Sequence, residues 1–140
     1  MSTEDNKALV RRWYEDFNQR NLEYELFTSD FVYHTPSMTL RGLDEFKQFL
    51  SHYLTAFPDA RFTVEDEIAE GELVASRATL HGTHQGEFMG IQPTGKQVTS
   101  TGIAIDRIVD GKFMEGWLEA DNLGMLQQLG VVPVLGQASE

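Results

Sequence analysis

The sequence predicts an α+β fold, with N-terminal helices packed on a strongly curved, mainly antiparallel sheet. Before Pro58 the apolar residues recur at helical spacing, whereas after it they alternate with the period of two that half-buried strands show. Short turns join the later segments, which is how antiparallel neighbours are connected. Such a sheet wrapped over two or three helices would leave one cone-shaped pocket, open at one end.

A first helix is expected to begin at Ser2 or Thr3, because both residue types cap helices well and acidic residues follow in the first turn. After an extended stretch at 31–36, Gly42 opens a second amphipathic helix, which Pro58 ends. Each helix has one broad apolar face. The residues of these faces are Leu9, Val10, Trp13, Tyr14 and Phe17 in the first helix, and Phe46, Phe49, Leu50, Tyr53, Leu54 and Phe57 in the second.

The first pair of strands is expected at 61–69 and 73–83, with Glu70 and Gly71 forming the turn between them. The expected register pairs Val64 with Arg77 and Phe62 with Thr79. In that register one face carries apolar side chains along most of its length and polar side chains at one end. Ligand pockets are commonly lined in this way, whereas a plain core face would not carry an arginine. The face consists of Phe62, Val64, Ile68, Leu73 and Ala75, followed by Arg77, Thr79 and His81.

An Asp-Gly step at 110–111 predicts a second hairpin, because this dipeptide between apolar runs favours a type I′ turn. The expected register places Ala104 opposite Trp117 and Asp106 opposite Glu115. Trp117 is therefore expected to form part of the pocket wall.

Asp121 stands where the last strand, which begins at Lys112, runs into a short helix. A carboxylate there can cap the helix N-terminus or project into the pocket. His84 lies at the mouth of a long glycine- and proline-rich loop over 84–97, and it can either face the pocket or hold the loop by a hydrogen bond. His34 can face the pocket or bond to a neighbouring strand.

Arg77 either meets a ligand oxygen or pairs with a carboxylate, because burying an arginine without a partner is costly. The candidate carboxylates are Asp66, Asp106 and Glu115. His81 is expected near the pocket rim. A metal site is not expected, because no His-x-x-x-His or His-x-His pair shares one face. His81 and His84 are three residues apart on a strand, so they point to opposite faces.

The 140 residues are expected to form a single domain over 1–140, with 131–140 as a tail. The chain has no cysteine, which excludes a disulfide framework and a thiolate nucleophile. Its first residues are acidic where a signal peptide is basic, and no apolar run is long enough to span a membrane, so a cytoplasmic protein is expected. A formal net charge of −11 argues against a nucleic-acid partner.

Several motifs together resemble the SnoaL-like polyketide cyclases, small cofactor-free proteins of the cone-shaped α+β barrel superfamily of nuclear transport factor 2. The resemblance covers about residues 5–130. The segments that carry it are GTHQGEFMGIQPTGK at 82–96, RIVDGKFMEGW at 107–117, DNLGMLQQLG at 121–130, and the shorter His34-Thr35-Pro36 and Phe57-Pro58-Asp59.

The resemblance implies an enzyme that closes a ring in a small, hydrophobic, carbonyl-bearing molecule by an intramolecular aldol reaction, without a metal or cofactor. The general acid/base aspartate of the family matches Asp121, which has the same Gln-Leu-Gly ending behind it. Ala104 stands where those cyclases place a histidine. The expected catalytic residues are Asp121 and His84, and the expected substrate-binding residues are Tyr14, His34, Phe49, Tyr53, Arg77, His81 and Trp117.

Two other functions stay open on the same fold. A hydrolase of the limonene-epoxide type would need Arg77 and two carboxylates, such as Asp106 with Glu115 or Asp121, to activate water. A non-catalytic protein would use the pocket only to bind a small hydrophobic ligand.

The outward face of the second hairpin is too apolar to be left bare in water. We therefore expect a homodimer that covers this face. The residues concerned are Ile103, Ile105, Met114 and Leu118.

Overall fold

The structure is a computed structural model that describes residues 2–134, so the end of the expected tail, residues 135–140, lies outside the described part. None of the helices in the described range is long and apolar enough to cross a membrane. The helices are α1 (Thr3–Asn18), α2 (Leu43–Ala56) and α3 (Asn122–Gln128), with a 3-10 turn, η1, at Tyr24–Leu26. The strands are β1 (Phe27–His34), β2 (Thr39–Arg41), β3 (Arg61–Glu70), β4 (Leu73–Thr83), β5 (Gln97–Val109) and β6 (Lys112–Ala120).

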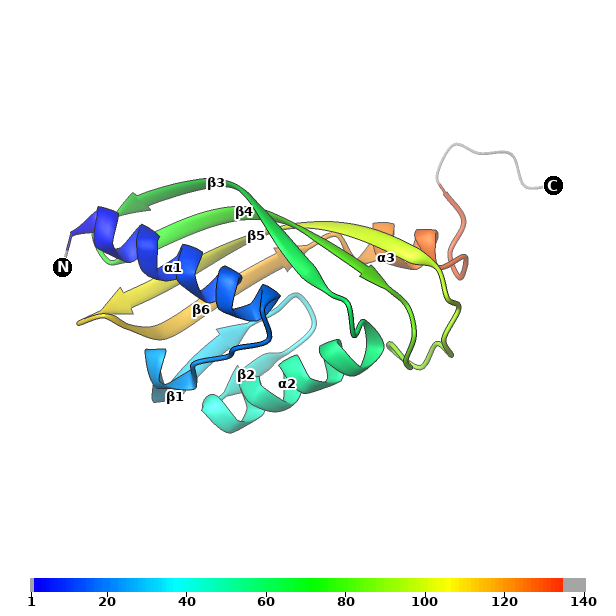
Figure 1. Ribbon diagram of the computed structural model, residues 1–140, viewed down its shortest axis with the longest axis horizontal. Helices are drawn as coiled ribbons and strands as arrows, with labels where there is room; N and C mark the ends of the chain where they lie inside the picture. The colour runs from blue at the N-terminus through cyan, green and yellow to red at the C-terminus, as the bar shows by residue number, and fades with distance from the viewer. Residues whose placement is uncertain (1, 135–140) are drawn as a thin grey trace.

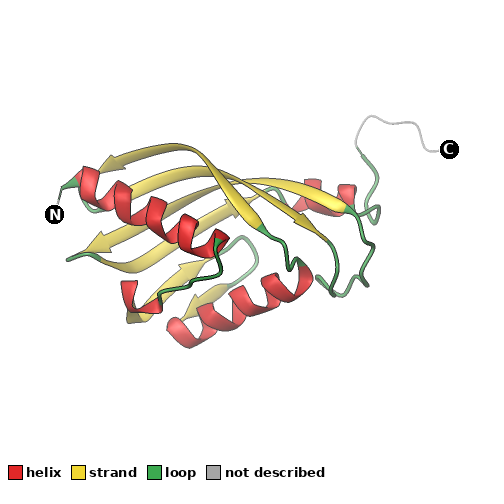
Figure 2. Ribbon diagram, viewed as in Figure 1, coloured by secondary structure: helices red, strands yellow, loops and turns green. Residues whose placement is uncertain are grey.

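The six strands form one sheet in the order β2-β1-β6-β5-β4-β3. All neighbours are antiparallel except β1 and β6, which run parallel. The sheet is curled but not closed, and α1 and α2 both cover its concave face (Figures 1 and 2). This architecture confirms the predicted α+β fold with a mainly antiparallel sheet.

Local interactions fix where the two long helices begin and end. The Ser2 hydroxyl accepts a hydrogen bond from the Asp5 backbone N–H at 3.1 Å, and the Asp5 carboxylate accepts one from the Ser2 N–H at 3.1 Å. This reciprocal pair is a capping box, which satisfies backbone donors that the first helical turn leaves free. The Arg20 guanidinium donates to the carbonyl oxygens of Phe17 and Pro58, so it ties the end of α1 to the end of α2.

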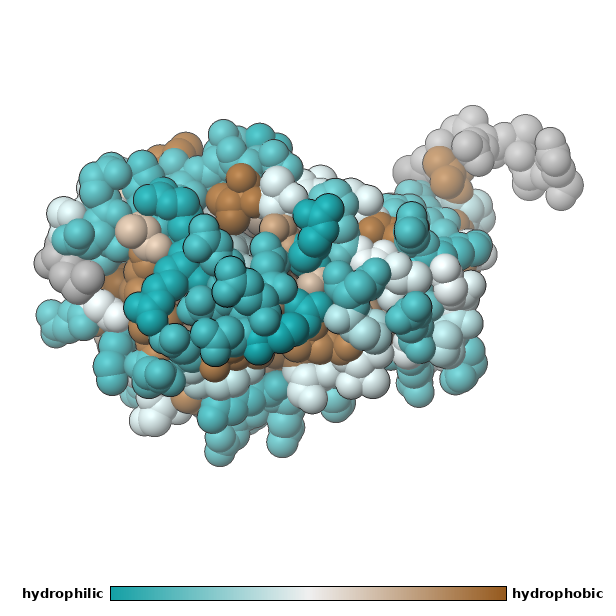
Figure 3. Space-filling view, in the orientation of Figure 1, coloured by the Kyte–Doolittle hydropathy of each residue, from teal (hydrophilic) through white to brown (hydrophobic). Residues whose placement is uncertain are grey.

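The core lies between these helices and the inner face of the sheet, in two clusters of buried apolar residues. The first contains Val10, Phe27, Phe31, Leu40, Phe46, Val74, Ile108 and Phe113. The second contains Phe17, Ala56, Phe57, Ala60, Leu80, Val98, Met125 and Leu129. The surface above them, on the side that carries α1, is mainly hydrophilic, with hydrophobic residues showing in strips (Figure 3).

The first hairpin contains a β-bulge that the apolar pattern does not reveal. Near the turn Glu70 faces Leu73, but beyond a register shift in the middle of β3, Phe62 faces Leu80. The predicted pairing of Phe62 with Thr79 is therefore wrong by one residue. Because side chains alternate along a strand, a one-residue error moves a whole set of side chains to the other face.

The predicted positions of Arg77 and His81 change accordingly. Both residues lie on the outer face of the sheet and not on the pocket side. The β4 residues that point toward the helices are small or apolar and buried: Val74, Ser76, Ala78 and Leu80.

The second hairpin has the expected turn at 110–111 but also a bulge beside it. Ile108 faces Phe113, whereas the next pair joins Arg107 to Glu115, so that Met114 is an extra residue in β6. Because of the bulge, every later side chain of β6 points to the face of the sheet opposite to the predicted one.

Three predictions for β6 are corrected by this shift. Asp106 faces Gly116, and Trp117 faces Ile105 on the outer side of the sheet, so Trp117 is not part of the pocket wall. Leu118 points inward instead of forming part of the outer apolar face.

Candidate functional site

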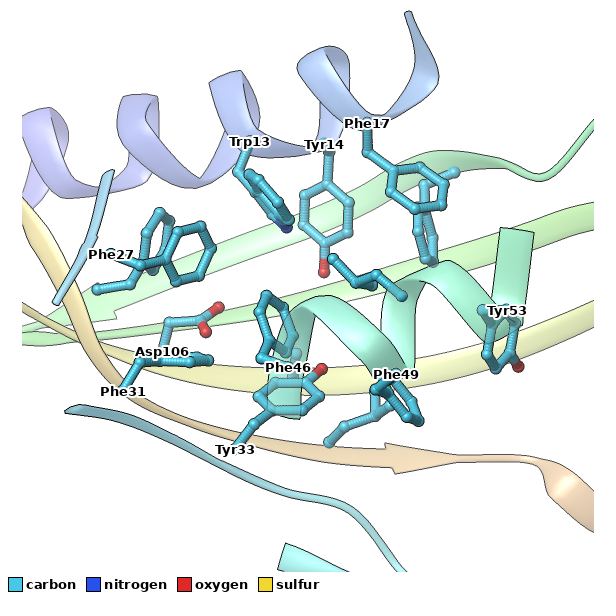
Figure 4. Close-up of a pocket in the computed structure, with 15 residues that line it drawn as sticks. Trp13, Tyr14, Phe17, Phe27, Phe31, Tyr33, Phe46, Phe49, Tyr53 and Asp106 are labelled. Atoms are coloured by element: carbon cyan, nitrogen blue, oxygen red, sulfur yellow. The ribbon is translucent and has the colours of Figure 1, made fainter. Parts of the chain in front are cut away.

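An aromatic cavity of about 90 Å³ lies between α1, α2 and the inner face of the sheet; we call it the inner cavity. Side chains from helices and strands converge on it from both sides (Figure 4). It is lined by Trp13, Tyr14, Phe17, Phe27, Phe31, Tyr33, Phe46, Phe49, Leu50, Tyr53, Phe62, Ala104, Asp106, Phe113 and Leu118.

Asp106, on β5, is the one carboxylate in this lining. Its side chain enters the inner cavity among aromatic rings, and within residues 2–134 the carboxylate makes no hydrogen bond to the protein (Figure 4). Burial raises the pKa of Asp106 to about 7, because an aromatic surrounding solvates the charged form poorly. At neutral pH this carboxyl group can therefore both accept and return a proton.

The space that Asp106 occupies exists because residue 116, directly opposite on β6, is a glycine. A Cβ at Gly116 would lie 2.9 Å from the Asp106 Oδ1 atom and 2.9 Å from the Tyr33 ring. The carboxylate and the Tyr33 ring thus lie together over the bare backbone of Gly116.

Two tyrosine hydroxyl groups belong to the same cavity. The Tyr14 and Ser76 hydroxyl oxygens are 3.1 Å apart and hydrogen-bonded, with Ser76 fully buried. Burial, reinforced by the charge of Asp106, raises the pKa of Tyr14 to about 12 and that of Tyr33 well above its ordinary value. Both groups stay protonated at neutral pH and can donate a hydrogen bond to an oxygen atom in the cavity.

A second hollow of about 550 Å³ opens beside the inner cavity; we call it the outer groove. It lies between the β1–β2 loop, α2 and the β4–β5 loop. Phe49 and Tyr53 line both spaces. The other residues of the outer groove are Thr35, Pro36, Ser37, Met38, His52, Thr55, Glu87, Phe88, Met89, Gly90 and Asn122.

Of the residues predicted from the sequence, Tyr14, Phe49 and Tyr53 do line the inner cavity. Asp121 does not. Its exposed side chain accepts a hydrogen bond from the Gly124 N–H at 2.9 Å and caps α3, which is the alternative that the sequence left open. Asp121 itself lines neither hollow described here, although its neighbour Asn122 lines the larger one, and the catalytic role expected for Asp121 stays a prediction.

His84 is fully buried but lies outside both hollows. Its Nδ1 accepts a hydrogen bond from the Thr94 N–H at 3.2 Å and lies 3.0 Å from the Thr94 hydroxyl oxygen. Its backbone N–H donates to the Lys96 carbonyl oxygen, and its ring packs beside Phe57. The geometry is that of a histidine that holds the base of the β4–β5 loop.

The remaining predicted residues lie on the outer face of the sheet. His34 stacks on Trp117 with ring centroids 5.5 Å apart, and the His34 Nε2 atom is 2.7 Å from a Glu115 carboxylate oxygen. Arg77 donates from Nε to Asp66 at 2.8 Å, which is the structural ion pair that was its alternative role. His81 belongs to a separate polar hollow with Asp59, Arg61, Gly82, Thr83, Gln97, Val98 and Thr99.

Sequence reasoning named Asp106 only for the alternative hydrolase site and as a possible partner of Arg77, and did not include it among the expected cyclase site residues. The available signal was an acidic side chain in the middle of an apolar strand, whereas its position opposite Gly116 depends on the bulge in β6. Within the described range, no three histidine, aspartate or glutamate side chains are gathered closely enough to hold a metal ion.

The family model of the SnoaL-like polyketide cyclases matches residues 8–129. Among curated proteins, the chain is 31% identical over 130 residues to the aklanonic acid methyl ester cyclase DnrD of Streptomyces peucetius, an alignment that covers 87% of this chain and 88% of the relative. It is 31% identical over 90 residues to the nogalonic acid methyl ester cyclase of Streptomyces nogalater, covering 64% of this chain and 67% of the relative.

Solved structures agree on the fold. AclR of Streptomyces galilaeus, a proposed hydroxylase, superposes with a TM-score of 0.86 at 33% identity, covering 94% of this chain and 100% of AclR. IdmH of Streptomyces antibioticus, a proposed polyketide cyclase, superposes with a TM-score of 0.80 at 35% identity, covering 90% of this chain and 99% of IdmH. These two neighbours are assigned different reactions, so the reaction must be argued from the site and not from the fold.

The matched residues include most of α1, all of α2 and α3 and the whole curled sheet, and so they contain every residue of the inner cavity. The chain therefore belongs to the SnoaL-like polyketide cyclase family.

Proposed function

We propose that this protein closes a ring in a small, hydrophobic, carbonyl-bearing molecule by an intramolecular aldol reaction, with Asp106 as the general acid/base. The observation that carries the proposal is a single carboxylate opening on an aromatic cavity that also presents two tyrosine hydroxyl groups. Membership in a family of cyclases supports an enzyme of this kind.

This proposal moves the acid/base role from Asp121 to Asp106. A general base must reach the proton that it removes, and Asp106 is the residue that faces an enclosed space. Asp121 is exposed and already accepts a backbone hydrogen bond at the start of α3.

A side chain of the protein itself, Asp106, can carry out both proton transfers of this reaction. The Asp106 carboxylate removes a proton from a carbon that is flanked by carbonyl groups, and the enolate carbon attacks a second carbonyl carbon in the same molecule. One carbon–carbon bond forms and one carbonyl π bond breaks, which leaves an alkoxide. The protonated Asp106 then returns its proton to that alkoxide, so the carboxylate is regenerated.

The tyrosines stabilise the charge that moves during these steps. The Tyr14 hydroxyl, held by Ser76 at 3.1 Å, can donate to the oxygen of the developing enolate. The aromatic lining keeps bulk water away, which strengthens this hydrogen bond and keeps the carboxylate basic.

The decisive experiment compares Asp106→Asn with Asp121→Asn on aklanonic acid methyl ester, the compound that appears in the name of the relative DnrD. Asparagine has nearly the same shape as aspartate but cannot take up the proton. We expect Asp106→Asn to lower kcat by about 100-fold or more, and the wild-type kcat/KM to rise with pH to a plateau with an apparent pKa near 7.

Asp121→Asn is the matched control, because asparagine caps helices about as well as aspartate. It should retain kcat within about twofold. If Asp121→Asn is the inactive variant and Asp106→Asn is active, the proposed role of Asp106 is wrong. If the wild type binds the ester but does not convert it, the protein is a ligand-binding member of the family.

A further inference from the structure

A second carboxylate, that of Glu67, is buried under α1 and lies outside the lining of the inner cavity. The Glu67 side chain is 5% exposed, and its Oε1 atom accepts a hydrogen bond from the Arg11 Nη1 atom at 2.6 Å. Its Oε2 atom is buried and has no hydrogen-bond partner in the described part of the chain. Buried polar atoms are nearly always partnered, so this oxygen indicates a role for Glu67 beyond the ion pair.

The strand pairing places Glu67 beside a hydroxyl group. Glu67 faces Ser76 directly in the pairing of β3 with β4, so the two side chains lie on the same face of the sheet. Ser76 is fully buried, and its hydroxyl group is hydrogen-bonded to that of Tyr14. Arg11 and Tyr14 are three residues apart and so share one face of α1. The Arg11–Glu67 and Tyr14–Ser76 contacts are therefore neighbours between α1 and the sheet.

The Tyr14–Ser76 hydroxyl pair lies between two carboxylates. The Tyr14 hydroxyl and the Asp106 carboxylate are both directed into the inner cavity (Figure 4). At about 90 Å³ the cavity has room for an ordered water molecule that bridges these two groups. Burial is the main cause of the raised pKa of Tyr14, and the charges of Asp106 and Glu67 both add to it. The Tyr14 hydroxyl is thus close enough to both carboxylates to be affected by their charges.

Asp106 needs a route by which to exchange its proton. Because burial raises its pKa to about 7, about half of the molecules carry a protonated Asp106 at neutral pH, and only the ionised form is a base. The other titratable groups that line the cavity are Tyr14 from α1, Tyr33 from β1 and Tyr53 from α2. Of these three hydroxyl groups, that of Tyr14 is the one bonded to another side chain within residues 2–134.

We propose that Tyr14, Ser76 and Glu67 form a proton path that carries a proton from Asp106, in the aromatic cavity, to the surface beside Arg11. The inference rests on the proposed function, in which Asp106 is the base. Arg11, whose side chain is 49% exposed, marks the outer end of the path. Ser76 and Glu67 do not touch the substrate, so they are positioning residues that serve Asp106.

The transfer conserves every proton. Asp106 gives its proton to the Tyr14 oxygen, directly or through the water molecule, while Tyr14 passes its own proton to Ser76 and Ser76 passes its proton to Glu67. The O–H bond of Asp106 breaks, an O–H bond forms at Glu67 Oε2, and each hydroxyl group again carries one proton. A rotation of the Glu67 carboxylate or a second water molecule closes the gap between Oε2 and Ser76. Glu67 then releases the proton to water beside Arg11, and Tyr14 can still donate to the enolate.

Carbon-13 NMR of labelled aspartate and glutamate carboxyl groups tests the path without a substrate. When Asp106 is protonated, the hydroxyl groups donate toward Glu67; when Asp106 is ionised, they donate toward Asp106. The Glu67 carboxyl carbon should therefore show a chemical-shift step where Asp106 titrates, near pH 7. The step should vanish in Ser76→Ala and in Tyr14→Phe, because each interrupts the chain of hydroxyl groups.

Glu65 is the matched control for this titration. It lies on the same strand and is exposed, with its Oε1 atom 3.0 Å from the Thr79 hydroxyl oxygen, and its carboxyl carbon should show no step where Asp106 titrates. A Glu67 carbon without a step in the wild type would overturn the inference. A step that persists in Ser76→Ala would also overturn it, because Asp106 would then act on Glu67 through space. Tyr14→Phe decides the same question if Ser76→Ala does not fold.

Turnover of the ester supplies a second measurement. Glutamine has the shape of glutamate but cannot take up a proton. Relative to the wild type, Glu67→Gln should lower kcat about threefold or more at pH 6 and stay within about twofold at pH 9, where Asp106 is already ionised. Glu65→Gln makes the same change of charge outside the path and should match the wild type at both pH values. An equal loss of kcat at both pH values in Glu67→Gln would mean that Glu67 has only a structural role.

The two measurements keep this inference separate from the proposed function. If Asp106→Asn is inactive but the Glu67 carbon shows no step, only the proton path fails. If the step is present in the wild type and lost in Ser76→Ala, but no ester is converted, only the proposed reaction fails.

Discussion

Asp106 is a carboxylate among aromatic rings, and this position is costly for the charged state. In the unfolded chain an aspartate has a pKa near 3.8, whereas burial raises the pKa of Asp106 to about 7 in the folded protein. Between these pH values the folded protein binds more protons than the unfolded chain. The free energy of unfolding should therefore fall as the pH rises through this window, and the fall should end above about pH 7.

We predict that Asp106→Asn removes this pH dependence. Relative to the variant, the wild type should lose up to about 4 kcal/mol of stability between pH 4 and pH 8, because each unit of pKa difference corresponds to about 1.4 kcal/mol. Urea unfolding at several pH values, with Asp121→Asn as the control, measures the difference directly. Parallel stability curves for the wild type and Asp106→Asn would show that Asp106 is not buried as described.

The strand-level structure explains why some site residues could be predicted from the sequence and others could not. Helical periodicity places Tyr14, Phe49 and Tyr53 on the buried faces of α1 and α2, and all three line the inner cavity. A helix tolerates an error of one residue in its boundary without turning its apolar face. A strand does not, because its side chains alternate with a period of two.

The strand predictions failed at two β-bulges for this reason. The extent of the strands and the Asp110-Gly111 turn are confirmed, whereas the first hairpin turns at Gly71 and Glu72, one residue later than the predicted Glu70-Gly71 step. An extra residue such as Met114 leaves no mark in the apolar pattern, since both faces of this hairpin carry apolar side chains. The bulges leave Arg77 and Trp117 on the outer face, whereas Asp106, on the unbulged strand β5, keeps its inward position.

The pairing of β5 with β6 gives a prediction about Gly116. Replacing it by alanine would bring a methyl group to 2.9 Å from the Asp106 carboxylate and from the Tyr33 ring, which is too close for either to stay in place. We expect Gly116→Ala to cost about 1–3 kcal/mol of stability and to lower kcat at least about tenfold, with a smaller change in KM.

A control from the same strand pair separates crowding from misplacement of the carboxylate. In Gly102→Ala the new methyl group would lie 3.1 Å from the Glu119 carbonyl oxygen and not beside Asp106. It should cost stability, as Gly116→Ala does, but keep kcat and its pH profile. Equal losses of kcat in both variants would mean that Gly116 has no particular role in placing Asp106.

At the scale of the whole molecule, the sheet has a covered face and an open one. α1 and α2 cover the concave face and enclose the site (Figure 1). The opposite face carries branched side chains at Ile103 and Ile105, which are 51% and 38% exposed. Some of the charged groups around them are paired on the same face, as Arg77 with Asp66 and Arg107 with Glu72. This pairing lowers the repulsion that a formal net charge of −11 would otherwise create between two copies.

We therefore predict a homodimer in which the outer faces of two sheets pack against each other, since a closed two-fold contact buries the same patch on both copies. Light scattering at micromolar concentration should give twice the mass of the 15.9 kDa chain. Ile103→Lys should shift the protein to the monomer, because it places two like charges at the centre of the contact. Leu123→Lys, at an equally exposed apolar position on α3, should leave the dimer intact. A wild-type monomer at these concentrations, or the same assembly state in both lysine variants, would rule out this interface.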